Sequence, residues 1–129
     1  GVKPTTAGFV LPLGATMNMS GTALYEGCVV LFVAQVFGVH LGWAEQGTLL
    51  VLAVLSAVAV ASIPGGSLPL IAGLLVTFGI PAEGIGIILG ADRLLDMTRT
   101  AVNVGSDIVT AVIVDERTAI KAAPPAASD

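Results

Sequence analysis

Polar side chains recur at helical spacing through the apolar last third of the chain. The pattern consists of Asp92, Asp96, Arg99, Thr100, Asn103 and Asp107. Because successive residues of a helix are about 100° apart around its axis, all six side chains fall within roughly 100° of one helix face. A charged group in such apolar surroundings costs about 2.5–3.5 kcal/mol. We therefore predict a final transmembrane helix over residues 84–117 whose polar face binds a ligand.

Residues 5–38 are mainly apolar and predict one transmembrane helix that is broken near its middle. The break is expected within residues 18–22, where Asn18, Ser20 and Gly21 interrupt the apolar sequence. A broken helix exposes backbone carbonyls, which bind cations. Such backbone is tolerated at membrane depth only where protein buries it or where it lines a cavity. The break is therefore a candidate cation site.

The segment between these two helices carries no charged residue from position 46 to position 82. Pro64, Gly65 and Gly66 lie near its middle and predict a tight turn. Each arm has about 13 to 15 residues and is roughly 20 Å long, which is shorter than a bilayer core of about 30 Å. We therefore predict a re-entrant helical hairpin over residues 44–81. Two ordinary crossings joined by a tight loop are the alternative.

The composition indicates an all-α membrane protein. The chain has 129 residues, of which 55% are hydrophobic and 11% are charged, and its mean hydropathy is +0.97. A soluble domain has about 25% charged residues. A chain this short also leaves much of its surface in water, so it has little room to bury so many apolar side chains. The lipid bilayer is therefore the expected surroundings.

Charge and cysteine content exclude several classes of protein. The net charge is −4 and there is no basic patch, so we expect no nucleic-acid partner. Cys28 is the single cysteine, and we expect it to pack in the apolar surroundings.

The few charges near the ends of the chain indicate its topology. Lys3 lies before the first crossing, and Arg117 and Lys121 lie after the last, which indicates that both termini are cytoplasmic. Residues 121–129 are predicted to be a disordered tail, and the initial glycine suggests a piece of a longer protein.

Arg99 is the strongest candidate for binding a substrate. Its guanidinium has the fork geometry that matches a carboxylate. An internal ion pair with Asp92, Asp96 or Asp107 is the alternative. Three carboxylates around one guanidinium leave an excess of negative charge, which favours a bound cation, a proton or a substrate ammonium group.

Two further candidates involve ions. Asn18, Asn103 and Asp107, together with the carbonyls of the broken helix, form a plausible Na⁺ site, although Asn18 could instead cap a helix. Glu26 is a candidate proton carrier, because a buried carboxyl group favours its neutral form. It could also be paired or face water. No nucleophile and base, phosphate-binding loop or dinucleotide motif occurs, so we do not expect an enzyme.

Three segments carry a resemblance to a known family. Residues 18–22, Asn-Met-Ser-Gly-Thr, resemble the Asn-Met-Asp-Gly-Thr signature of the dicarboxylate/amino acid:cation symporters, which include the excitatory glutamate transporters. Residues 92–107 resemble the last transmembrane helix of that family, and residues 63–65 resemble the tip of its second re-entrant hairpin. The resemblance covers roughly residues 9–117, in the same order along the chain.

The resemblance implies the C-terminal part of an elevator-type transport domain over residues 1–120, in a multi-pass protein of the plasma (inner) membrane. Residues 5–38 would be the seventh helix, residues 44–81 the second hairpin and residues 84–117 the eighth helix. The family forms homotrimers and uses no organic cofactor. Na⁺ and/or H⁺ would be the coupling ions, and the rest of the transporter would be a necessary partner.

The resemblance also implies specific roles for side chains. The substrate would be bound by Arg99, Asp96, Thr100, Asn103, Ile63, Ser67 and Thr22. Sodium would be bound by Asp107, Asn103, Asn18, Gly14 and Thr16. Glu26 falls at the position where proton-coupled members carry a glutamate.

The expected function is symport of an acidic amino acid, glutamate or aspartate, with Na⁺ and/or H⁺. Ser20 departs from the family signature and removes an anionic ligand from one sodium site. The first six helices and the first hairpin of the family are absent from this sequence. A symporter of C4-dicarboxylates or neutral amino acids, or a structural membrane subunit without transport activity, is the alternative.

Overall fold

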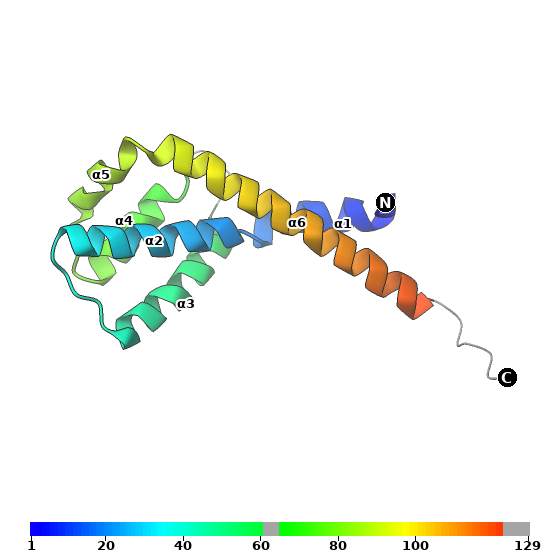
Figure 1. Cartoon of the computed structure of the whole chain (residues 1–129), viewed down its shortest axis with the longest axis horizontal. Coiled ribbons are helices and arrows are strands. Elements are labelled where there is room, and N and C mark those ends of the chain that lie inside the picture. The colour runs from blue at the N-terminus through cyan, green and yellow to red at the C-terminus, as the bar shows by residue number, and fades with distance from the viewer. Residues whose placement is uncertain (61–64, 123–129) are drawn as a thin grey trace.

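The computed structural model describes residues 1–60 and 65–122, and every regular element in these ranges is a helix. The α-helices are α1 (Pro4–Met17), α2 (Ser20–Val36), α3 (Trp43–Ala59), α4 (Leu68–Thr77), α5 (Ile85–Leu89) and α6 (Asp92–Ala122), with a short 3-10 helix, η1, at Ala82–Gly84. Figure 1 shows α6 as a long rod, with α1 beside its C-terminal half and the other helices gathered at its N-terminal half. The all-helical prediction is confirmed for the described residues.

The first helix is broken at the position that the sequence predicts. α1 ends at Met17 and α2 begins at Ser20, with non-helical backbone at Asn18 and Met19 between them. The backbone N–H of Asn18 donates to the carbonyl oxygen of Gly14 at 2.8 Å, which closes the last turn of α1. By length and composition, α1 and α2 together are long and apolar enough to cross a membrane.

α3 and α4 form the two arms predicted for the hairpin, and both are shorter than a candidate membrane span. Their shared packing partner is α2, which contacts both arms (Figure 1). Gly65 follows the undescribed residues 61–64 and has a φ of +72°, a backbone conformation that favours glycine. The predicted tip residue Ile63 lies outside the described residues. Re-entry into the membrane stays a prediction.

The final helix differs from the single helix predicted over residues 84–117. The chain forms η1 and α5, turns at Gly90 and Ala91, and only then enters α6. Glycine is a poor helix former, and three glycines, Gly84, Gly86 and Gly90, lie in this short stretch. α6 also continues to Ala122, so the first two residues of the predicted disordered tail are helical. Residues 123–129 lie outside the described part of the chain.

The apolar core lies where α2 meets α4 and the segment after it. Val30 and Val33 of α2 pack with Ile71, Leu75 and Ile80 in this core. Their burial fixes α2 between the hairpin arms on one side and α6 on the other. The core therefore holds in place the polar faces of α2 and α6.

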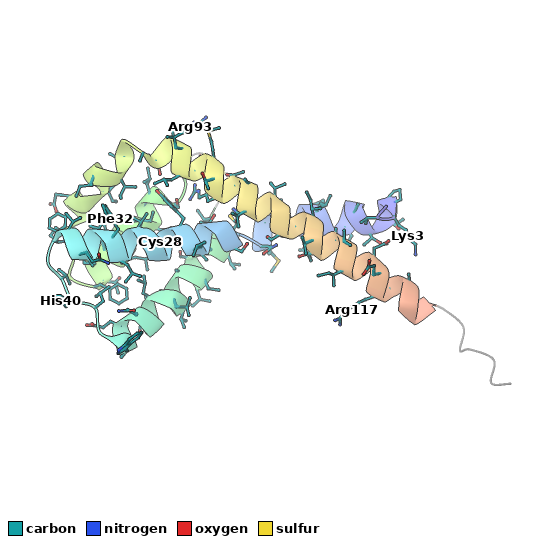
Figure 2. The ribbon with its side chains drawn as sticks, in the orientation of Figure 1. Lys3, Cys28, Phe32, His40, Arg93 and Arg117 are labelled. Atoms are coloured by element: carbon teal, nitrogen blue, oxygen red, sulfur yellow. The ribbon has the colours of Figure 1, made fainter. Side chains whose placement is uncertain are left out.

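Much of the outer surface remains apolar. Phe9, Trp43 and Leu94 are 71%, 90% and 72% exposed, respectively. The charged side chains Lys3 and Arg117 lie towards the end of the molecule where α1 begins and α6 ends (Figure 2). A surface of this kind is typical of a chain surrounded by lipid or by further protein.

Candidate functional site

The first polar cluster lies at the break between α1 and α2. The Asn18 side-chain amide donates to Asp107 Oδ1 and to the Ser106 hydroxyl, both at 2.8 Å. The Asp107 carboxylate is buried and lies so close to Gly14 that a methyl group at position 14 would overlap it. The structure therefore brings together three of the predicted sodium ligands, Gly14, Asn18 and Asp107.

This cluster is chemically suited to a hard cation. The Asp107 carboxylate supplies an anionic oxygen, and the Gly14 carbonyl retains a second lone pair after accepting the Asn18 N–H. The Asn103 carbonyl, one turn earlier in α6, accepts the Ser106 hydroxyl at 2.9 Å. Alkali and alkaline-earth cations prefer such carboxylate and carbonyl oxygens. The donor set thus fits a hard cation such as Na⁺.

The second polar cluster joins the start of α2 to the middle of α6. The Asn103 side-chain oxygen accepts the backbone N–H of Gly21 at 2.7 Å, and its amide donates to the Thr22 hydroxyl at 3.1 Å. A side chain at position 21 would overlap the backbone carbonyl of Arg99. The absence of a side chain at Gly21 is therefore what allows the two helices to approach so closely.

The third polar cluster surrounds Arg99. Its guanidinium is buried, donates to Asp96 Oδ1 from Nε at 2.8 Å, and donates from Nη1 to the hydroxyl of Ser67. The guanidinium also lies 5.3 Å from the ring centroid of Tyr25, a cation–π arrangement. The Tyr25 hydroxyl donates to Asp92 Oδ1 at 2.9 Å. Helices α2 and α6 and the start of α4 therefore meet at one guanidinium.

The fourth polar contact joins α2 to the first hairpin arm. The Glu26 side chain is 0% exposed, and its Oε2 accepts a hydrogen bond from the Ser56 hydroxyl of α3. Its other oxygen, Oε1, has no hydrogen-bond partner among the described residues. Glu26 is thus neither exposed to water nor paired with a cationic group at salt-bridge distance in the described structure.

Three predicted site residues are not joined to these clusters. The Thr100 side chain is exposed and donates to the Asp96 carbonyl of its own helix at 2.8 Å. The Thr16 side chain is also exposed and donates to the Leu13 carbonyl of α1 at 2.9 Å. Ile63 lies outside the described residues.

Three side chains that the sequence reasoning did not assign take part in the clusters. Tyr25 contacts Arg99 and Asp92, Ser106 contacts Asn18, and Ser56 contacts Glu26. For Ser56 a signal was available, because it is the one polar residue in the apolar run over residues 49–60. A lone polar side chain in an apolar membrane helix usually has a partner.

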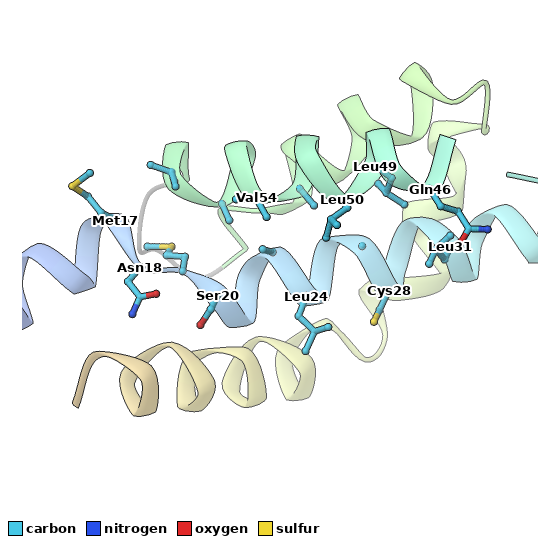
Figure 3. A pocket seen from close by; sticks show the side chains of 16 residues that line it. Met17, Asn18, Ser20, Leu24, Cys28, Leu31, Gln46, Leu49, Leu50 and Val54 are labelled. Atoms are coloured by element: carbon cyan, nitrogen blue, oxygen red, sulfur yellow. The ribbon is translucent and has the colours of Figure 1, made fainter. Parts of the chain in front are cut away.

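A separate apolar groove lies between α2 and α3. Its volume is about 590 Å³, and its walls carry Leu24, Cys28, Leu50 and Val54 (Figure 3). Asn18 also lines this groove, so its end reaches the break in the first helix. Arg99, Asp96 and Asp107 do not line it, which separates the groove from the charged side chains of α6.

The described residues form an all-helical fold with an internal polar site, in which charged side chains are buried between apolar helices. A comparison with protein families identifies the family: residues 1–117 match the sodium:dicarboxylate symporter family. The chain belongs to this family.

Curated relatives agree with this assignment. The chain is 39% identical over 108 residues to the proton/sodium-glutamate symport protein of Bacillus subtilis (strain 168), which covers 84% of this chain and 25% of that protein. It is 41% identical over 114 residues to an excitatory amino acid transporter of Caenorhabditis elegans, covering 88% of this chain and 23% of that protein. It is 43% identical over 114 residues to human excitatory amino acid transporter 2, and this match covers 88% of this chain and 20% of that protein. The chain thus spans about a quarter or less of the length of these relatives.

Proposed function

We propose that this chain forms the C-terminal part of the transport domain of a symporter that carries glutamate or aspartate together with Na⁺ and/or H⁺. The single observation that carries this proposal is the buried pair of Arg99 and Asp96, which faces Ser67 of the hairpin. The names of the relatives, a proton/sodium-glutamate symport protein and excitatory amino acid transporters, support the same substrate class.

The Arg99–Asp96 pair is matched to a substrate that carries both charges. A substrate carboxylate that binds Arg99 displaces Asp96 and leaves that buried carboxylate with only the exposed Arg93, 3.9 Å away, as a cationic neighbour. An acidic amino acid replaces the lost partner with its ammonium group, so both buried charges stay compensated. A C4-dicarboxylate would bring no ammonium group to Asp96, and a neutral amino acid would leave Arg99 without a side-chain carboxylate. Acidic amino acids therefore fit best.

Each predicted substrate ligand would bind a different group of the substrate. Arg99 would hold the side-chain carboxylate, Asp96 and Thr100 the amino group, and Asn103 the main-chain carboxylate. Ser67 would close over the substrate from the hairpin. Thr22 binds Asn103 in the described structure and would orient its amide. Ile63 completes the proposed set.

The ion sites follow from the other clusters. Asp107, with the backbone of Gly14, Asn18 and Asn103, would bind one Na⁺, and the Thr16 carbonyl would contribute to another beneath the hairpin tip. Glu26 would carry the coupled proton, because it is buried and its Oε1 has no partner in the described residues. A re-entrant hairpin that acts as the gate, an elevator movement and a homotrimer complete the proposal.

Uptake of labelled aspartate tests this function. The full-length transporter that carries these residues is reconstituted into liposomes, and uptake is measured with and without an inward Na⁺ gradient and an inward proton gradient. Gradient-dependent accumulation of aspartate, inhibited by glutamate and not by succinate, is expected. Accumulation of succinate in preference to aspartate would support the dicarboxylate alternative. Absence of gradient-driven uptake of either compound would support a structural subunit.

A further inference from the structure

The carboxyl group of Glu26 has one hydrogen-bond partner in the described structure, and that partner belongs to a different helix. The Ser56 hydroxyl lies on α3, the first arm of the hairpin, and donates to Glu26 Oε2. Glu26 is fully buried, and its Oε1 has no partner among the described residues. A buried carboxyl group with a single partner depends strongly on that partner.

A hydroxyl group suits both protonation states of this carboxyl group. When Glu26 is ionised, the Ser56 hydroxyl donates a hydrogen bond to Oε2. When Glu26 is protonated on Oε2, the Ser56 oxygen can accept a hydrogen bond from this carboxyl O–H, because a hydroxyl has both a donor and two acceptor sites. The hydroxyl hydrogen would then turn towards the Ala53 carbonyl of its own helix, which lies 3.4 Å away. Alanine at position 56 offers neither interaction.

The surroundings leave few other groups that could take this role. Arg99 on α6 is the cation whose charge acts on Glu26, but its described hydrogen bonds go to Asp96 and Ser67. α4 contains no titratable residue, and the one in α3, Glu45, lies eleven positions before Ser56, roughly 16 Å along the helix. The neighbouring Tyr25 donates to Asp92. The remaining titratable groups near this site are Asp92 and Asp96 on α6 and Tyr25 and Cys28 on α2, of which the Cys28 thiol is exposed.

We propose that Ser56 is a positioning residue that ties the first hairpin arm to the protonation state of Glu26. This inference rests on the proposed function, in which Glu26 carries the coupled proton. The hydrogen bond between Ser56 and Glu26 would then link the coupled proton to the first arm of the hairpin. Loss or gain of the proton at Glu26 would reverse the direction of the α2–α3 hydrogen bond and so change how firmly α3 is held against α2.

The test is the pH profile of gradient-driven aspartate uptake by the full-length transporter, normalised for each variant to its own maximum. Ser56→Ala should move the half-maximal pH by about one unit, the size expected for one hydrogen bond to a carboxylate. Ser56→Thr keeps the hydroxyl and should keep the original midpoint. Thr48→Ala is the matched control, because Thr48 is exposed on the same helix and donates only to the Ala44 carbonyl.

A double variant identifies the group through which Ser56 acts. Glu26→Gln alone should give a flat profile, and adding Ser56→Ala should leave it flat. An unchanged midpoint in Ser56→Ala, with a flat profile in Glu26→Gln, would overturn the role of Ser56 while the role of Glu26 stands. A pH-dependent profile in Glu26→Gln would instead contradict the proton site itself. If Ser56→Ala does not yield folded protein, Ser56→Cys keeps the volume with a weaker donor, and its midpoint must shift in the same test.

Discussion

The Asn18 side-chain amide lies 2.8 Å from Asp107 Oδ1 and so joins the break in the first helix to the middle of α6. The Asp107 carboxylate also packs against the backbone of α1 at Gly14, where a methyl group would overlap it. The position of this carboxylate is therefore set by two residues that lie about one helical turn apart in sequence.

Replacing Gly14 by alanine should weaken sodium binding. The new methyl group would overlap the Asp107 carboxylate, and overpacking of this kind costs about 1–3 kcal/mol. We expect the Na⁺ concentration for half-maximal uptake to rise by roughly ten-fold or more. Gly8→Ala is the matched control, because a methyl group there meets nothing within 4 Å. Equal Na⁺ dependence in the two variants would contradict the sodium assignment.

Replacing Arg99 by alanine should remove selectivity for acidic amino acids. The variant loses the buried partner of a substrate carboxylate, which costs about 2–5 kcal/mol of binding. Because Asp96 remains to bind the ammonium group, neutral amino acids should become better competitors. Arg117→Ala is the control, since the Arg117 side chain is exposed on the same helix and forms no ion pair in the described structure. Competition of labelled-substrate binding measures both affinities, and undiminished aspartate affinity in Arg99→Ala would disprove the assignment.

Replacing Glu26 by glutamine should make uptake insensitive to pH between about 5 and 8. If Glu26 carries the coupled proton, uptake by the unmodified protein falls as the proton becomes scarce at higher pH. Glutamine resembles the protonated side chain and does not titrate, so this dependence should disappear. Glu83→Gln changes an exposed carboxylate and should preserve the profile. Initial rates across this pH range, at fixed Na⁺, give the comparison.

Replacing Gly21 by alanine should destabilise the protein, whereas Gly27→Ala should not. Both glycines lie in α2, and alanine favours a helix by about 1 kcal/mol relative to glycine. At position 21 the methyl group would overlap the Arg99 carbonyl and lie 2.9 Å from the Val102 Cβ, whereas at position 27 it meets nothing within 4 Å. We expect the thermal midpoint in detergent to fall for Gly21→Ala and to stay or rise for Gly27→Ala. Equal midpoints would show that α2 and α6 are not this closely packed.

Replacing Ser20 by aspartate should increase the cooperativity of sodium activation. The Ser20 hydroxyl lies 3.1 Å from that of Ser106, which in turn contacts Asn18, so a carboxylate at position 20 would be added beside the proposed sodium cluster. Hard cations favour anionic oxygen ligands. The Hill coefficient for Na⁺ should rise in Ser20→Asp relative to the unmodified protein, while Ser20→Ala should leave it unchanged. The same coefficient in all three proteins would rule out a lost sodium site at this position.

The sequence by itself determined the helices and the polar face of α6. The spacing of Asp96, Arg99, Asn103 and Asp107 is a local property of one helix, so it could be interpreted without knowing what lies opposite. The break at residues 18–19 was equally local, because polar residues and a glycine interrupt an apolar run there. The single helix expected over residues 84–117 was wrong at its start, where local glycines and the path of the chain end α5 before α6 begins.

Only the tertiary structure decided which helix faces meet. The contact between Gly14 and Asp107 joins residues that are far apart in sequence, as do those between Ser67 and Arg99 and between Ser56 and Glu26. No periodicity encodes such pairs, because they depend on how the apolar surfaces of α2, α4 and α6 pack together. That packing buries a guanidinium and several carboxylates between the helices, where each must find a partner.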